Sequence, residues 1–206
     1  YLKGAIGYGG PCFPRDNLAF LHLARRIGVQ AMLAEATDRL NRYQVHRLLD
    51  LVLSRLPPRG RVGILGLSYK PNTDVIEESQ AVQLAEYLLD RGIPVVLYDP
   101  AALDNVRHVL GRGATLASSA EECVRQADVL VLATPWEEFK GLSPSHLNYS
   151  NGRPVVIDCW RILDGRQYGP AVEYVVLGRG AHPDDPRQAW PGPIAAHGAA
   201  TTIPEV

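Results

Sequence analysis

The sequence predicts an α/β fold in which a doubly wound, Rossmann-like parallel sheet follows a helical segment. Three observations support this prediction. Short apolar runs alternate with helical patterns from about residue 61 onward, which is typical of βαβ units. The apolar runs are continuous, as expected for strands that are covered on both faces. A longer apolar pattern with a period near 3.6 residues comes before them, over about residues 31–56.

The first unit is expected to be helical and to span residues 1–58. A short helix is predicted over about residues 16–27, with Gly28 as its stop. The second helix, over about residues 31–56, ends at the segment Pro57-Pro58-Arg59-Gly60, because proline cannot continue a helix. That segment is the expected boundary between the two units.

The sheet unit is expected over residues 59–180. Strands are predicted at about 61–67, 94–98, 115–117, 129–133, 155–158 and 174–177. Helices are predicted between them, at about 79–90, 102–110, 120–126 and 137–140. Residues 181–206 combine proline and glycine with little apolar periodicity, so we expect a mobile tail there.

The loops that follow the strands are the expected ligand-binding segments, because ligands of open α/β sheets bind at the carboxyl ends of the strands. Three stretches qualify: Tyr69-Lys70, Asp99-Pro100 and Thr134-Pro135-Trp136. The first strand continues as G-I-L-G-L-S over residues 63–68, without the G-x-G-x-x-G pattern of dinucleotide sites. The sheet is therefore expected to suit a nucleotide without being an evident NAD site.

Composition excludes several classes of partner. The chain has 206 residues and a formal net charge of -1, so no overall field attracts nucleic acid or an anionic membrane. No apolar run approaches the roughly 20 residues of a membrane span, and no signal peptide opens the chain. Three cysteines show neither paired nor metal-binding spacing, so we expect free thiols, no metal and a cytoplasmic location. The chain begins without Met, and we expect it to be a fragment of a longer protein.

The strongest candidate for chemistry is Cys12, which follows a glycine-rich loop. Glycines at positions 7, 9 and 10 let the backbone bend and approach a ligand closely. Pro14 fits the first position of a helix, which places Cys12 just outside a helix N-terminus. Partial positive charge there, with Arg15 nearby, favours the thiolate, and Asp16 lies about one turn away. A lone cysteine is more often a small buried hydrophobe, and we expect that role for Cys123 and Cys159.

Two stretches resemble segments of a known family. Residues 1–16 read Y-L-K-G-A-I-G-Y-G-G-P-C-F-P-R-D, and residues 66–74 read G-L-S-Y-K-P-N-T-D and are followed by Glu78-Ser79. The first resembles the catalytic-cysteine segment of the UDP-glucose/GDP-mannose dehydrogenase family, and the second resembles the motif that opens its UDP-binding domain. Lesser similarities follow in the family's order: Asn41 with Gln44, Tyr98-Asp99-Pro100, Thr134 to Phe139, and Asp158 with Arg161.

The resemblance implies an NAD-dependent oxidoreductase that oxidises the C6 alcohol of a UDP-hexose to a carboxylate, with UDP-glucose converted to UDP-glucuronate. It implies that Cys12 attacks the aldehyde intermediate and forms a thiohemiacetal. Such an adduct can expel a hydride and become a thioester, whereas a free aldehyde cannot. Hydrolysis then releases the acid, and Asp16 matches the family's aspartate that assists the water and proton steps.

The resemblance also implies binding roles. The residues expected around the sugar nucleotide are Lys3, Gly7, Tyr8 and Gly9. The residues expected to touch the nicotinamide cofactor are Phe13, Pro14 and Arg15. Tyr69 and Lys70 match the pair that meets the nucleotide portion of the substrate, where Lys70 would contact the diphosphate as a point charge. Arg161 is the expected sugar contact, because Trp160 stands where some members carry an arginine. A homodimer through the long helix is also expected.

Departures from the family pattern leave alternatives open. Glu77 stands where the family usually has an arginine near the cofactor, and Val75 stands where a second aspartate is common. The chain could therefore be a non-catalytic sugar-nucleotide-binding relative, or use GDP-mannose or a UDP-N-acetylhexosamine. A cysteine hydrolase that pairs Cys12 with a histidine is a further alternative. We expect the given chain to lack the family's N-terminal NAD-binding domain, and we therefore expect the isolated chain not to turn over.

Overall fold

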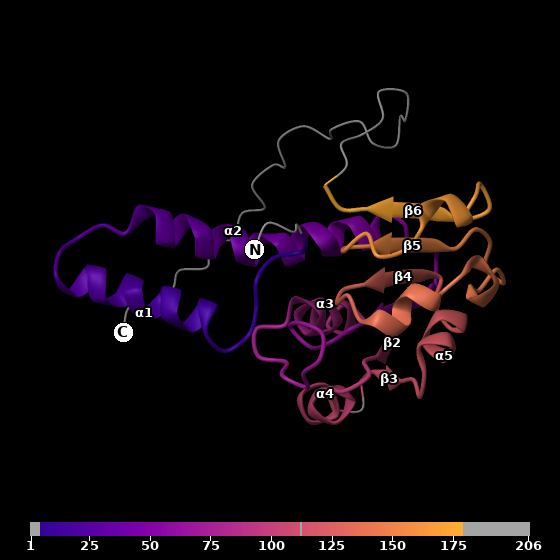
Figure 1. Cartoon of the computed structure of the whole chain (residues 1–206), viewed down its shortest axis with the longest axis horizontal. Helices are drawn as coiled ribbons and strands as arrows, with labels where there is room; N and C mark the ends of the chain where they lie inside the picture. Colours follow the sequence, from indigo (N-terminus) through magenta and orange to yellow (C-terminus); the bar gives the residue numbers. More distant parts are fainter. Residues whose placement is uncertain (1–4, 112, 179–206) are drawn as a thin grey trace, which may run out of the picture.

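A computed structural model describes residues 5–111 and 113–178 of the chain, and a six-stranded parallel sheet forms its centre (Figure 1). The strand order is β3-β2-β1-β4-β5-β6, so the chain starts in the middle of the sheet and winds outward in both directions. The strands are β1 (Val62–Leu65), β2 (Val95–Tyr98), β3 (Thr115–Leu116), β4 (Val129–Leu132), β5 (Val155–Asp158) and β6 (Glu173–Val176). The doubly wound α/β prediction is confirmed.

The sheet is covered on both faces, which explains why its strands are apolar throughout. The connecting helices are α3 (Gln80–Leu89), α4 (Leu103–Leu110) and α5 (Ala120–Arg125), with 3-10 helices η1 (Glu137–Gly141), η2 (Pro144–His146) and η3 (Gly165–Gln167). One face packs against α3 and α4, where Ile64 and Leu97 meet Leu84 and Leu88. The other face packs against α5 and η1, where Phe139 is fully buried.

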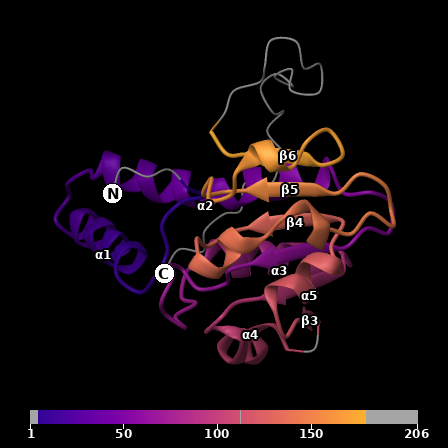
Figure 2. The same cartoon turned by 45° about the vertical axis from the view of Figure 1, so that its right-hand side comes forward.

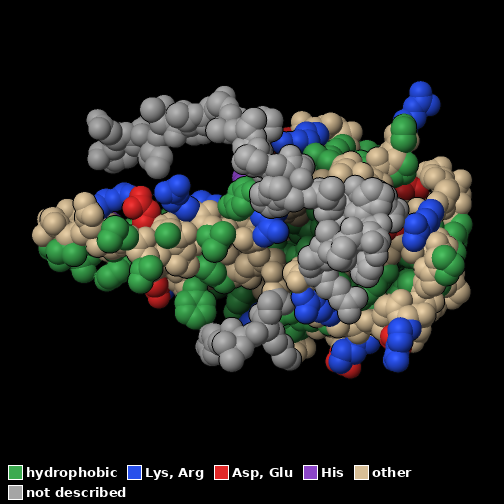
Figure 3. All heavy atoms as spheres, turned by 90° about the horizontal axis from the view of Figure 1, so that it is seen from above, with side chains coloured by type: hydrophobic (Ala, Val, Ile, Leu, Met, Phe, Trp, Pro, Cys, Tyr) green, Lys and Arg blue, Asp and Glu red, His purple; other side chains and the backbone are tan. Residues whose placement is uncertain are grey.

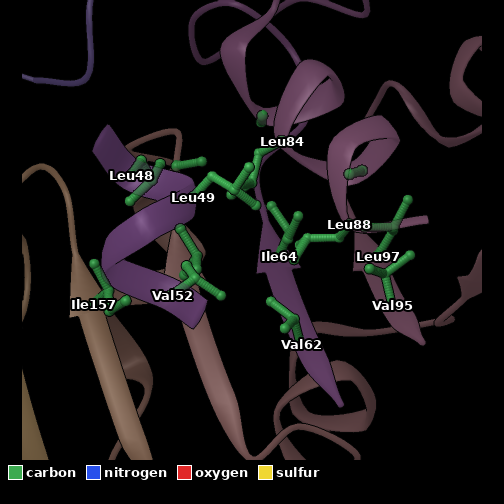
Figure 4. Close-up of a cluster of buried hydrophobic side chains, with 14 of the residues drawn as sticks. Leu48, Leu49, Val52, Val62, Ile64, Leu84, Leu88, Val95, Leu97 and Ile157 are labelled. Atoms are coloured by element: carbon green, nitrogen blue, oxygen red, sulfur yellow. The ribbon is translucent and has the colours of Figure 1, made fainter. Parts of the chain in front are cut away.

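The long helix α2 (Met32–Leu53) belongs to the sheet core in its second half. Val45, Leu48, Leu49 and Val52 are buried, and Figure 4 shows Leu48, Leu49 and Val52 pointing toward the sheet and α3. Burial of each such side chain contributes about 1.5–3 kcal/mol to folding relative to an exposed one. The expected boundary near residue 58 lies in the loop between α2 and β1, but the packing of α2 runs across it.

The first half of α2 forms a helical hairpin with α1 (Phe13–Arg26), and this hairpin extends away from the sheet (Figures 1 and 2). The amide of Asn17 donates to the carbonyl of Ala34 at 2.9 Å and ties the two helices together. Both helices keep apolar side chains exposed, including Phe20, Leu33 and Leu40, and hydrophobic atoms gather along this end of the molecule (Figure 3). The hairpin therefore presents an apolar surface that the described residues do not cover.

The observed elements follow the predicted order, with shifts at their ends. The first helix starts at Phe13 rather than near residue 16, and the first strand ends at Leu65 rather than 67, because Gly66 turns the chain with a φ of +87°. The 3-10 helices η2 and η3 were not predicted, since such short turns leave little periodicity. The predicted tail, 181–206, lies outside the described residues. In the described ranges, no helix is long and apolar enough to cross a membrane.

Candidate functional site

The glycine loop before Cys12 is seated against the loop that follows β1. The backbone N–H of Gly10 donates to the carbonyl of Glu77 at 2.9 Å. A Cβ at residue 10 would lie 2.6 Å from the ring of Tyr69, and Gly10 has a φ of +86°. In the structure the absence of side chains at these glycines lets the backbone approach the sheet unit closely, and Gly7 and Gly9 also line the cleft described below.

Asn41 on α2 holds the middle of this loop. Its Nδ2 donates to the carbonyl of Tyr8, and its Oδ1 accepts from the backbone N–H of Tyr8, each at 2.8 Å. The same Oδ1 accepts from Nε2 of Gln80, at the start of α3, at 3.1 Å. A Cβ at Gly7 would lie 2.2 Å from that Nε2. Neither Asn41 nor Gln80 was predicted as a site residue, although Asn41 was part of the family resemblance.

The loop and the sheet edge border a small open cleft. Its lining residues are Ile6, Gly7, Gly9, Ser68, Tyr69, Glu78, Ser79, Gln80, Ala81, Ala133, Thr134 and Trp160. The amino end of α3 forms part of the wall, and the side chain of Ser79 caps it by accepting from the N–H of Val82. A helix N-terminus carries partial positive charge that favours an anionic group, such as a phosphate.

Cys12 is the N-cap residue of α1 and is exposed. Phe13 is the first helical residue, so Pro14 occupies the second helical position rather than the first. The N–H of Asp16 donates to the carbonyl of Cys12 at 2.8 Å, and the carboxylate of Asp16 pairs with Arg15 at 3.0 Å. The thiol has no hydrogen-bond partner among the described residues, so its position depends on the backbone on either side of it.

Tyr8 links the glycine loop to α1 through its ring. The ring lies edge-on to that of Phe13, with centroids 6.4 Å apart. Its hydroxyl is buried and has no hydrogen-bond partner within the described ranges. Burial raises the pKa of Tyr8 above its usual value, and the nearby carboxylate of Asp38 adds to this shift.

Tyr69 and Lys70 lie at the carboxyl end of β1, as predicted. Tyr69 lines the cleft, and Lys70 is exposed with its Nζ 5.4 Å from the centroid of the Tyr69 ring. The adjoining loop is anchored at its far side, where Nδ2 of Asn105 donates to the carbonyl of Asp74 at 2.8 Å. The pair therefore stands on a loop that is anchored to α4 through Asp74 and closed by the bond from Tyr69 N–H to the carbonyl of Val75.

Asp99, directly after β2, ties the loop after β1 to the loops after β2 and β4. Its Oδ2 accepts from the backbone N–H groups of Leu67 and Ser68 at 2.7 and 3.0 Å, and from Nε1 of Trp136 at 3.2 Å. The backbone N–H groups of Leu67 and Ser68, in the loop after β1, are therefore already bonded to a carboxylate of the chain itself. This arrangement agrees with the missing G-x-G-x-x-G pattern, and it gives Asp99 a structural role.

Arg161 does not line the cleft. Its guanidinium donates to the carbonyl of Leu177 beyond β6, through Nη2 at 2.5 Å. Trp160 lies at the cleft instead, with its Nε1 donating to the carbonyl of Ala133 at 2.7 Å. Sequence reasoning placed Trp160 at a family arginine position but did not predict it as a cleft residue. Lys3 lies outside the described residues.

Within the described ranges, the other two cysteines and the histidines form no second thiol site. Cys123 and Cys159 are buried in the core, as expected, and burial raises the pKa of the Cys123 thiol to about 12 and raises the pKa of Cys159 as well. Among the described residues, no histidine hydrogen-bonds Cys12. His46 stacks on Tyr87, and His146 bonds Ser143. The structure thus offers no support for a cysteine–histidine pair.

Comparison with known proteins decides the family. Residues 63–165 match the UDP-binding domain of the UDP-glucose/GDP-mannose dehydrogenase family, and residues 1–43 match its central domain. The chain belongs to this family. The cleft therefore lies where a central-domain segment meets the UDP-binding domain, and the two matched segments contribute its opposite walls.

Individual relatives agree with this assignment. UDP-glucose 6-dehydrogenase AglM of Haloferax volcanii is 39% identical over 168 residues, covering 81% of this chain and 38% of the relative. The structure resembles a UDP-glucose dehydrogenase from Pyrobaculum islandicum, with a TM-score of 0.69, 32% identity, and coverage of 83% of this chain and 38% of the other. It also resembles a GDP-mannose dehydrogenase from Pseudomonas aeruginosa, with a TM-score of 0.70, 26% identity, and coverage of 84% and 41%. The chain thus spans about two fifths of the length of these relatives.

Proposed function

We propose that the chain is the thiol-bearing and UDP-sugar-binding part of an NAD-dependent dehydrogenase that oxidises C6 of UDP-glucose to the carboxylate of UDP-glucuronate. One observation carries the proposal. The loop that precedes the exposed Cys12 forms one wall of the cleft whose other wall is the carboxyl edge of the UDP-binding sheet. A sugar nucleotide bound at that edge would present its hexose toward the segment that bears the thiol.

The sheet edge suits the nucleotide portion. The diphosphate would meet the amino end of α3, whose partial charge favours anions, and the ammonium group of Lys70. The rings of Tyr69 and Trp160 line the cleft and offer flat apolar surfaces to the uracil or the ribose. Gly7 and Gly9 would bring backbone rather than side chains to the sugar.

Cys12 would act on the aldehyde that the first oxidation produces. Its thiolate Sγ forms a bond to C6, and the carbonyl oxygen takes up a proton, which gives a thiohemiacetal. After the second oxidation the same carbon is a thioester. Water then adds to C6, the C–S bond breaks, and the carboxylate leaves while the thiol is restored. Asp16, one turn along α1, is the group proposed to hold that water once a ligand displaces Arg15 from it.

We propose that the chain contacts only the nicotinamide half of NAD, at the start of α1. The loop after β1 cannot hold the pyrophosphate, because Asp99 already occupies the amides of Leu67 and Ser68. The start of α1 offers the exposed ring of Phe13 and the exposed guanidinium of Arg15 as contacts for the nicotinamide half, whereas Pro14, which was also expected to touch the cofactor, is buried. When bound, NAD supplies the hydride-accepting chemistry that both oxidations need. We propose that other parts of the whole protein hold most of the cofactor.

The test is an assay of the full-length protein with a panel of UDP- and GDP-hexoses, following NADH formation and the acid product. UDP-glucose should give two NADH per UDP-glucuronate. Cys12→Ala should lower kcat by on the order of 10³-fold or more, as removal of a nucleophile does in other enzymes. Cys123→Ala is the matched control, since that thiol is buried between α5 and the sheet and should leave kcat within about twofold.

The other outcomes separate the alternatives. Faster turnover of GDP-mannose or a UDP-N-acetylhexosamine would keep the chemistry and correct the substrate. Tight UDP-sugar binding without NADH formation would show a non-catalytic sugar-nucleotide-binding relative, a role that the exposed Glu77 first suggested. Equal activity of Cys12→Ala and the unchanged protein would overturn the proposed role of the thiol.

We also propose that two copies associate through the helical hairpin. Leu33 is 86% exposed and Met32 is 69% exposed, although both are large apolar side chains. An exposed apolar stripe along a helix marks an interaction surface more often than a solvated face. The second half of α2 is already used by the sheet, so the free first half is the part available to a second copy.

A further inference from the structure

Cys12 depends on its neighbours for its position, because its own side chain touches no hydrogen-bonding group among the described residues. It lies four residues after Tyr8 and two after Gly10. Within the described residues, the hydrogen bond from Gly10 N–H to Glu77 and the two bonds between Tyr8 and Asn41 hold this stretch to the rest of the chain, together with the buried side chain of Ile6. The geometry of these ties therefore sets the location of the thiol.

Both polar atoms of the Asn41 carboxamide have hydrogen-bond partners of the right kind. Nδ2 meets a carbonyl, whereas Oδ1 meets two N–H donors, from Tyr8 and from Gln80. Gln80 is 8% exposed and lines the cleft, so its side chain connects the cleft wall to the amide that holds the thiol loop. Gly7 leaves no room for another side chain between these two amides.

We propose that Asn41, supported by Gln80, is a positioning residue for Cys12: it sets the register of the glycine loop against α3, so that the thiol faces a sugar bound in the cleft. The proposal rests on the function proposed above. It also predicts that a ligand bound in the cleft beside Gln80 changes the reactivity of the Cys12 thiol, because Gln80, Asn41 and Tyr8 form one continuous chain of hydrogen bonds.

The sharpest test is Asn41→Asp, which keeps the shape of the side chain and replaces the Nδ2 donor to the carbonyl of Tyr8 by an oxygen. As a carboxylate, residue 41 can still accept hydrogen bonds from the N–H of Tyr8 and from Nε2 of Gln80. Its second oxygen, however, faces the carbonyl oxygen of Tyr8, and two acceptors cannot bond each other. When protonated, it regains one donor and restores the native pattern. In the full-length protein, kcat for UDP-glucose oxidation should fall by about tenfold or more at pH 8, while KM changes by less than about threefold.

The pH profile distinguishes positioning from a general loss of stability. The ratio of variant to unchanged activity should rise as the pH falls from about 8 to about 5.5, because the facing carbonyl of Tyr8 raises the pKa of an aspartate at residue 41 above its ordinary value, so that it takes up a proton within this range. Asp38, Arg42 and Glu78 are charged groups near this loop, and the ratio removes their titration because both proteins contain them. Gln44→Glu is the control on the same helix, since it keeps an acceptor for its partner Arg47. It should leave kcat unchanged at every pH.

A second readout does not require turnover. The rate of alkylation of Cys12 by iodoacetamide should differ from the unchanged protein by about threefold or more in Asn41→Asp, and by less than twofold in Gln44→Glu. If the unchanged protein oxidises no sugar nucleotide, the proposed function fails while this measurement still decides the role of Asn41. If Asn41→Asp does not fold, Gln80→Met decides instead, because it removes the carboxamide that donates to Asn41 while keeping a side chain of similar length, and it should shift the same rate. Equal alkylation rates in all folded variants would overturn the proposal.

Discussion

The carbonyl oxygen of Glu78 lies so close to Gly9 that a Cβ at residue 9 would be 2.4 Å from it. The two residues belong to different units of the chain, the thiol loop and the loop after β1. Glu78 itself has a left-handed φ of 51°, which aims its carbonyl at the glycine. Contact between backbone and backbone leaves no flexible group that could move aside.

Gly9→Ala should therefore push the thiol loop away from the sheet edge. We expect the free energy of unfolding to fall by about 1–3 kcal/mol, as in other overpacked sites, and UDP-glucose binding to weaken. Urea denaturation and calorimetric titration of the full-length protein measure the two effects. Gly141→Ala is the control, since nothing lies within 4 Å of a Cβ there. Equal stability of both variants would show that the close approach is not maintained in solution.

Asp99 should be a stability determinant, since its carboxylate accepts six hydrogen bonds from Leu67, Ser68, Ala101, Ala102 and Trp136. Asp99→Ala leaves the buried N–H groups of Leu67, Ser68 and Ala102 without this acceptor, at about 1–3 kcal/mol each, so the loss should be at least about 3 kcal/mol. Urea unfolding of the variant gives the value. Asp104→Ala, which removes an exposed pair with Arg107, should cost less than about 1 kcal/mol. A comparable loss in both variants would contradict the structural role.

The three thiols should differ sharply in reactivity. Cys12 is exposed, whereas Cys123 and Cys159 are buried and their thiols are kept protonated by raised pKa values. Brief treatment of the folded full-length protein with iodoacetamide, followed by peptide mass spectrometry, should modify Cys12 and leave the other two intact. Labelling in urea should modify all three. Rapid native labelling of Cys123 would mean that the cover of α5 over the sheet opens readily.

The stability of the chain should fall at alkaline pH. Burial raises the pKa of Tyr98 and of Tyr168 to about 12 from an ordinary value of 10, and that of Cys123 to about 12 from 9. These groups stay protonated in the folded state while the unfolded chain releases protons, so their contribution is complete below about pH 9 and is lost as the pH rises toward about 12. Urea midpoints between these pH values test this. Tyr168→Phe should make the decline shallower, and an unchanged slope would show that this hydroxyl titrates normally.

The proposed homodimer predicts that a charge on the free half of α2 blocks association. Leu33→Glu and Leu40→Glu should shift the full-length protein to half the mass in light scattering after size exclusion, because a carboxylate would be buried at the interface. Val109→Glu on α4 is the control, since that side chain is also 57% exposed but lies outside the hairpin. A full-length protein that is monomeric without any substitution would contradict the proposal.

The sequence by itself determined the kinds of element and their order. Apolar periodicity reports which local segments bury one face or both, and continuous apolar runs such as Val129–Leu132 indicated a sheet covered on both sides. Sequence also singled out Cys12 and the Tyr69-Lys70 pair, because these stretches combine unusual residue types over a short span. Such features lie within a few consecutive residues, so they can be recognised without knowledge of the fold.

Only the tertiary structure decided what surrounds the thiol. The contacts of Tyr8 with Asn41 and of Asn41 with Gln80 join residues 33 and 39 positions apart, and no local pattern reports such pairs. The same is true of Trp160, which reaches the cleft, while Arg161, its neighbour with a left-handed backbone, turns away to Leu177. Adjacent residues in a loop can point in opposite directions, and long-range packing chooses between them. For that reason the sequence located the thiol and the sheet edge, and the fold determined which side chains lie between them.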